Sequence, residues 1–219
     1  SGRAGDMYIT VGTGDSGFGG AILMHAGTSS ALSGGTINVL SGFSTSSSSG
    51  NLYLRTVNSG AAGVSGQLVL STGTTSSGDS GMIYIGTGQA TSGRAGDMYI
   101  TTGTGDSGFG GAILMHAGTS SALSGGTINV LSGFSTATSS GNLYIRTVNS
   151  GTAGVSGQIV LSTGTSSSGD TGSLYIGTGS STLGAGGPVF VSAGYGDTGT
   201  GAGVLVRAGT SSASSGGIV

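Results

Sequence analysis

The chain has 219 residues, of which 51 are glycine and only 5% are charged, and its formal net charge is −2. Because it carries few cations and no cationic excess, it has no electrostatic footprint for nucleic acid or for an anionic membrane surface. It contains no cysteine, which excludes disulfides and thiolate metal sites. Its hydrophobic fraction of 35%, at so low a charge, is the reverse of the composition of disordered chains, so we expect an ordered protein.

Tandem repetition dominates the chain from its first residue. Residues 1–91 return almost verbatim as residues 92–182, and a looser, partial third copy occupies residues 183–219. A fixed internal period is typical of an architecture that stacks one small unit many times, in contrast to a single globular core. No polar capping repeat stands at either end, so we expect the chain to be a segment of a longer protein.

Within each long unit, a shorter repeat recurs about every 15 residues and combines an apolar-x-apolar triplet with a Gly-rich link. In residues 1–91 the six triplets are Met7–Ile9, Ile22–Met24, Ile37–Val39, Leu52–Leu54, Leu68–Leu70 and Ile83–Ile85. Since the first and third positions are always Ile, Leu, Val or Met, the period is two, which predicts a short strand with one buried face. The density of glycine argues against a helix.

Energetics require that such repeats stack. One short repeat buries two apolar side chains, worth roughly 3–6 kcal/mol, whereas ordering its residues costs roughly 15–30 kcal/mol of backbone entropy. We therefore predict an all-β fold, a single continuous β-solenoid over residues 1–219 made of stacked short strands with Gly-rich corners. Alternating shorter and longer spacings favour two-sheet coils of about 30 residues, and triangular coils of about 45 residues are the alternative.

The Gly-rich links are predicted to form the corners of these coils. Glycine there permits positive φ or close packing of the backbone, and the aspartates are expected to hydrogen-bond the corner backbone.

Three motifs in the links would carry chemistry in other proteins. Residues 12–17 match G-x-G-x-x-G, but a dinucleotide site needs that motif to open a helix, and here another predicted strand follows. Residues 14–17 resemble the surroundings of the nucleophile in chymotrypsin-like serine proteases, yet the only histidines are His25 and its copy His116, on the outward side of a strand. The aspartates take no regular corner position, which argues against a calcium ladder. We predict no catalytic, metal or cofactor-binding residues and no enzyme activity.

The middle residue of each triplet should point away from the core and form an exposed apolar and aromatic ladder. Such patches often mark contact surfaces, although tyrosines also favour strands for stacking alone. The candidate lateral-contact ladder consists of Tyr8, Leu23, Tyr53, Tyr84, Tyr99, Leu114, Tyr144, Tyr175 and Phe190. We expect any partner to contact these features at the 91-residue spacing.

Short apolar triplets between Gly-Ser-Thr links resemble the Gly/Ser/Thr-rich β-solenoid repeat proteins, of the parallel β-helix type, in extracellular fibres. The resemblance implies a structural protein: a segment of an extracellular or cell-surface filament, surface fibre or appendage that self-associates through stacked coils and aromatic ladders. Its partners would be copies of itself or sister chains, with no nucleic acid and no membrane insertion, and its Ser/Thr corners could carry O-linked glycan. The alternative is an ice-binding (antifreeze) β-solenoid, although the regular T-x-T file of that class is missing.

Overall fold

The computed structural model describes residues 4–219 and has neither a helix nor a strand over that range. The predicted all-β solenoid is therefore wrong, in its two-sheet form and in its triangular form alike. The physical reason is that, among the described residues, the extended runs are not paired with neighbouring runs through ladders of backbone hydrogen bonds. Without such a ladder, an extended run is not a strand of a sheet.

The backbone hydrogen bonds in the described residues all close turns. In each of the eight, an N–H donates to the carbonyl oxygen of the residue eight positions earlier in the chain, at 2.8 to 3.5 Å. The donor and acceptor residues are Gly20 and Gly12, Gly35 and Gly27, Gly50 and Gly42, Gly111 and Gly103, Gly126 and Gly118, Gly141 and Gly133, Ala202 and Gly194, and Gly217 and Gly209. Apart from these eight bonds, the described residues make no backbone–backbone hydrogen bond, whereas a folded domain makes about one internal hydrogen bond per residue.

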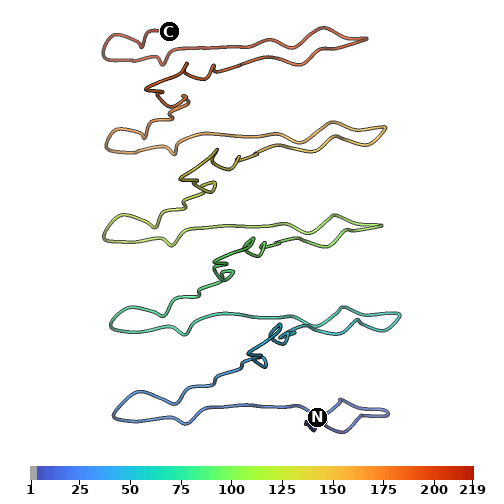
Figure 1. Ribbon diagram of the computed structural model, residues 1–219. Coiled ribbons are helices and arrows are strands. Elements are labelled where there is room, and N and C mark those ends of the chain that lie inside the picture. The colour runs from blue at the N-terminus through green and yellow to red at the C-terminus, as the bar shows by residue number, and fades with distance from the viewer. Residues whose placement is uncertain (1–3) are drawn as a thin grey trace. The chain divides into compact units, whose positions relative to one another are not determined.

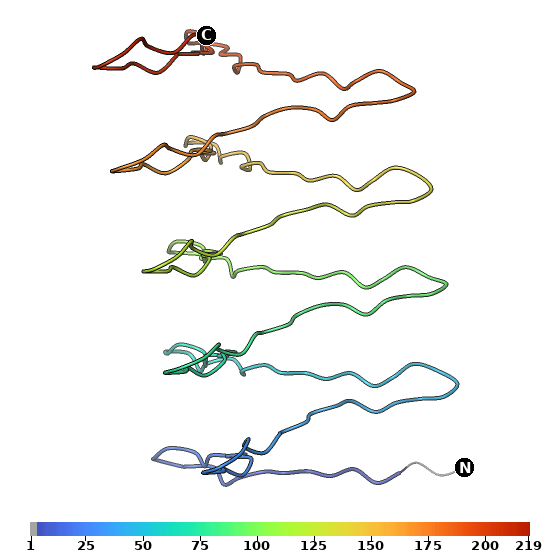
Figure 2. The same ribbon diagram turned by 90° about the vertical axis from the view of Figure 1, so that its left-hand side faces the viewer.

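The chain divides into two units, Ser1–Ile113 and Leu114–Val219. Within each unit, extended runs alternate with narrow turns at which the backbone reverses direction (Figure 1). Figure 2 shows the same alternation from the side. The apolar triplets lie on the runs and the Gly-Ser-Thr links form the turns.

Serine stabilises one class of closed turn. In the turn of residues 27–35, the N–H groups of Ala31 and Leu32 donate to Ser29 Oγ at 3.3 and 2.9 Å. The serine at the corresponding position does the same in four further turns, at Ser44, Ser120, Ser135 and Ser211. A hydroxyl that accepts from the following backbone N–H groups favours a turn over an extended conformation.

Glycine takes the place of that serine in the second class of turn. In the turn of residues 12–20, Gly14 stands where Ser29 stands in the turn of residues 27–35. A Cβ on Gly14 would lie 2.6 Å from the carbonyl oxygens of Gly17 and Phe18, so the backbone has no room for a side chain here. Glycine is therefore required at this corner because backbone carbonyl oxygens approach it closely. Positive φ, the other reason expected, occurs over residues 4–219 only at Gly63 and Gly78.

In seven of the eight turns the closing residue is a glycine, and it faces the residue just before the turn or the first residue of the turn. A Cβ on Gly20 would lie 3.0 Å from Val11 Cβ. In the second copy, a Cβ on Gly111 would lie 2.9 Å from Thr102 Cβ, and the Thr102 hydroxyl donates to the Gly111 carbonyl at 3.0 Å. The two arms of a turn can meet because one of them carries no side chain at the point of contact.

No apolar side chain of the described residues is buried. The chain exposes 21704 Å², whereas a compact monomer of 20.5 kDa exposes about 8,900 Å² and an unfolded one about 30,000 Å². The half-buried residues lie at the turns and are Ala26, Ser44, Ala117, Ser135, Gly196 and Ala208. Residues 4–219 therefore form ordered turns without a hydrophobic core.

Candidate functional site

The apolar triplets are the most extensive feature of the exposed surface. In almost every triplet the first residue is the least exposed and the middle residue the most. Ile83, Tyr84 and Ile85, for example, are 53, 88 and 68% exposed. The period of two in the sequence therefore appears as a graded exposure, although the less exposed side is still open to solvent.

All nine residues of the candidate lateral-contact ladder are exposed, from 71% at Leu23 to 91% at Tyr175. The only ring contact in the described part of the chain involves Tyr144 and an arginine, so no ladder residue stacks on another there. Contact of the ladder with a second chain stays a prediction.

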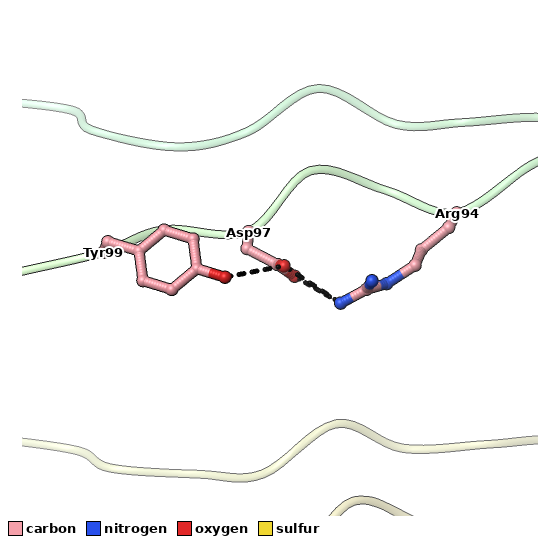
Figure 3. A network of polar contacts seen from close by, with 3 residues as sticks. All are labelled: Arg94, Asp97 and Tyr99. Atoms are coloured by element: carbon pink, nitrogen blue, oxygen red, sulfur yellow. Dashed lines mark hydrogen bonds and ion pairs between the residues drawn. The ribbon is translucent and has the colours of Figure 1, made fainter.

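Two ladder tyrosines have their hydroxyl group fixed by an aspartate two residues earlier. Tyr8 and Tyr99 donate to Asp6 and Asp97 at 3.4 and 3.3 Å. Arg94 Nη2 also binds Asp97, at 2.8 and 3.0 Å from its two carboxylate oxygens, so Asp97 lies between Tyr99 and Arg94 (Figure 3). This ion pair is at the surface, where such pairs contribute little to stability, and it neutralises the edge of the run.

Two other ladder tyrosines have asparagine as the fixing residue. Asn51 Nδ2 donates to the Tyr53 oxygen at 3.2 Å, and Asn142 Nδ2 donates to that of Tyr144 at 3.1 Å. Arg146 Cζ lies 5.9 Å from the centroid of the Tyr144 ring, within the range of a cation–π contact. These two segments, residues 51–58 and 142–149, are cationic, because each contains an arginine and no carboxylate.

A shallow hollow follows each of these asparagine-fixed tyrosines. The hollows have volumes of about 480 and 470 Å³ and open at the surface. The first hollow lies where the chain enters a turn that is longer than the turn of residues 12–20. In the longer turn Gly66 faces Thr56, ten positions earlier, whereas Gly20 faces Val11, nine positions earlier. The first is lined by Arg55, Thr56, Val57 and Asn58, and the second by Arg146, Thr147, Val148 and Asn149. Over residues 4–219 neither arginine has an ion-pair partner, so each hollow presents a guanidinium that no carboxylate neutralises.

The aspartates at the turns do not hydrogen-bond the corner backbone as predicted. Asp15 and Asp79 make no hydrogen bond or ion pair within the described residues. In the turn of Asp15 the Gly20 N–H donates to the Gly12 carbonyl at 3.1 Å, and close to Asp79 the Ser77 N–H donates to Thr75 Oγ1 at 3.4 Å.

Three residues after Asp15, in the same turn, Phe18 is fully exposed at 103%, and its copy Phe109 at 104%. These two rings were not predicted as contact residues because they lie outside the triplets. The available signal was a large aromatic side chain within a link of glycine and serine.

The part of the chain that the structure describes shows no metal-binding cluster, no membrane-spanning helix and no dinucleotide-binding motif in its usual setting. No group of three His, Cys, Asp or Glu side chains gathers there as metal ligands would. No helix in that range is long and apolar enough to cross a bilayer. The G-x-G-x-x-G match at residues 12–17 lies within a closed turn that leads into an extended run, not into a helix.

Comparison with known proteins assigns no family to the chain: no protein-family model, no curated protein and no solved structure matches it.

Proposed function

We propose that the chain is a structural, self-associating segment of an extracellular or cell-surface filament, fibre or appendage. Its partners are copies of itself or sister chains. One observation carries this proposal: apolar side chains recur in regular rows over residues 4–219, and none of them is buried. A single chain in this form gains little hydrophobic stabilisation against its conformational entropy. Other chains that cover the rows supply what the single chain lacks.

The amount of open surface supports an assembly with several neighbours. The chain exposes 21704 Å², about 12,800 Å² more than a compact monomer of its mass would expose. A stable pairwise interface buries about 1,600 Å² in total. One dimer contact would therefore leave most of the apolar rows in water, whereas contacts on several sides would cover them.

Repetition and low charge support open-ended growth. Each contact surface of residues 1–91 returns in residues 92–182, so that one chain offers the same surface twice. A surface that binds a different surface on the next copy produces filaments when the arrangement does not close on itself. With only 5% charged residues and a net charge of −2, repulsion between copies is weak. O-linked glycan on the Ser/Thr turns, where it occurs, would decorate such a filament.

Ice binding, the alternative, has less support. It needs a flat array of free threonine hydroxyls, whereas Thr102 and Thr178 donate theirs to the carbonyls of Gly111 and Gly187 at 3.0 and 2.9 Å. Large side chains such as Tyr84 also stand in the middle of the triplets, 88% exposed. A thermal hysteresis gap in solutions of the purified chain would favour the alternative.

The proposal is tested by the concentration dependence of assembly. We expect the purified chain to sediment as large species above a critical concentration and to show fibres by electron microscopy. A matched variant with Ile22→Ser, Ile37→Ser and Leu52→Ser should remain small at the same concentration, because each substitution removes an apolar side chain that assembly would cover. A wild-type chain that stays monomeric at every accessible concentration would contradict the proposal.

A further inference from the structure

We propose that copies of the chain dock through a specific contact. The turn that carries Asp15 and Phe18 in one copy, here called the knob, enters the hollow of residues 55–58 in another. The inference rests on the proposed function, because it names the contact through which the copies associate. Its partner is a second copy of this chain, recognised by charge and by an apolar ring.

The hollow has the donors that a carboxylate needs. Arg55 has no ion-pair partner within residues 4–219, and the Thr56 hydroxyl and the Asn58 amide stand in the same lining. In the second copy, the guanidinium of Arg146 lies over the Tyr144 ring, which restrains it while its N–H groups stay available. A guanidinium beside neutral donors binds a carboxylate with charge-assisted hydrogen bonds.

The hollow also has an apolar part. Val57 is 82% exposed and its copy Val148 is 81% exposed, although both are lining residues. Contact with another apolar group would remove the valine side chain from water, which is favourable. The occupant should therefore carry a carboxylate and an apolar group close together.

The knob has that combination. Asp15 has no partner in the described chain, and Phe18, three residues later, is fully exposed. The turn that presents them is restrained by the bond from Gly20 N–H to Gly12 O at 3.1 Å and by the confined Gly14. A turn that is ordered before binding loses less entropy when it docks.

Knobs and hollows recur together. Asp106 and Phe109 repeat the knob, and residues 146–149 repeat the hollow, both 91 residues after the first copy. Two knobs and two hollows per chain allow a second contact to form within an already associated pair, which raises the overall affinity without a new kind of contact. In the third, partial copy Asp197 remains but Thr200 takes the place of the phenylalanine, so the knob is incomplete there.

The other partnerless aspartates provide a matched control. Asp79 and Asp170 also lie at a turn and lack an ion pair in the described residues. The residue three positions after each is Met82 in the first copy and Ser173 in the second, so neither turn presents an aromatic ring. Charge reversal at these positions changes net charge by the same amount as reversal at the knobs.

Three double variants test the contact: Arg55→Asp with Arg146→Asp, Asp15→Arg with Asp106→Arg, and the control Asp79→Arg with Asp170→Arg. Light scattering at low salt gives the critical concentration of assembly for each. We expect the hollow and knob variants to raise it by about tenfold or more, and the control to leave it near the wild-type value. High salt should raise the wild-type critical concentration as well, because it screens the contact.

Mixing separates a specific contact from a general effect of charge. In an equimolar mixture of the hollow variant and the knob variant, every Asp knob can meet an Arg hollow and every Arg knob an Asp hollow. We expect the mixture to assemble near the wild-type critical concentration. Wild-type-like assembly of the hollow variant alone, or no recovery in the mixture, would overturn the docking contact and leave self-association standing. A wild-type chain that does not assemble would overturn the proposed function, and the contact with it.

Discussion

At the scale of single residues, close approach explains why glycine occupies particular positions of the turns. Gly14 has two backbone carbonyl oxygens where its Cβ would be, and Gly20 faces Val11 across the base of the same turn. Glycine content could be read from the sequence, but its reason could not, because close approach depends on residues that fold back onto one another.

Substitution of Gly14 tests this explanation. In Gly14→Ala, the new Cβ would lie 2.6 Å from the oxygens of Gly17 and Phe18, so the turn has to open or shift. We expect the closed turn to lose about 1–3 kcal/mol, as for other overpacked positions, and the Gly20 amide to exchange its hydrogen faster. Gly17→Ala is the control, since a Cβ on Gly17 would have nothing within 4 Å. Equal exchange rates in the two variants would show that close approach does not confine Gly14.

At the scale of the turn, the two classes differ in the third residue of the turn, which is Gly14 in one and Ser29 in the other. Where Gly14 leaves space for backbone carbonyls, Ser29 brings a hydroxyl that takes the N–H groups of Ala31 and Leu32. The Gly-rich links indicated where these turns lie, and the structure places turns there. Aspartate was the wrong choice of turn acceptor, because Asp15 makes no hydrogen bond in the described chain.

Removal of the serine hydroxyl should loosen one turn and leave the others intact. In Ser29→Ala, the Leu32 amide loses its acceptor at 2.9 Å, and a hydrogen bond of this kind contributes about 1 kcal/mol net. Hydrogen exchange at Leu32 should therefore accelerate about fivefold. Ser30→Ala serves as control, because the Ser30 hydroxyl makes no hydrogen bond in the described residues. An unchanged Leu32 rate in Ser29→Ala would contradict a stabilising role for the hydroxyl.

In the extended runs, the alternation of side chains could be predicted from the sequence, but the pairing of the backbone could not. The period of two in triplets such as Ile83–Ile85 is real, since exposure follows it. A strand, however, also needs a neighbouring backbone for its N–H and C=O groups, and the residues of a run do not specify that neighbour. The same limit applies to the candidate ladder: the sequence located Tyr53 and Tyr144, but the hollow beside each depends on a longer turn that only the folded chain reveals.

At the scale of the whole molecule, the turns and the runs differ in what they need for order. A turn such as residues 27–35 contains its own hydrogen bonds, at 2.8 Å between Gly35 N–H and Gly27 O. A run such as Leu52–Leu54 has no backbone partner in the described chain, and its side chains are 52 to 76% exposed. If copies cover the runs, order in the runs should depend on concentration and order in the turns should not.

Hydrogen exchange measured below and above the critical concentration of assembly tests that difference. Below it, we expect amides of the runs, such as Tyr53, to exchange near the rate of an unprotected chain, and turn amides such as Gly35 to be measurably slower. Above it, the run amides should slow by about tenfold or more, because binding that occurs only in the assembled state stabilises the ordered form by mass action. Turn amides should change less, since their acceptor is already present in one copy. Protection of the runs that does not vary with concentration would mean that the single chain orders them by itself, against the self-association proposed from its exposed surface.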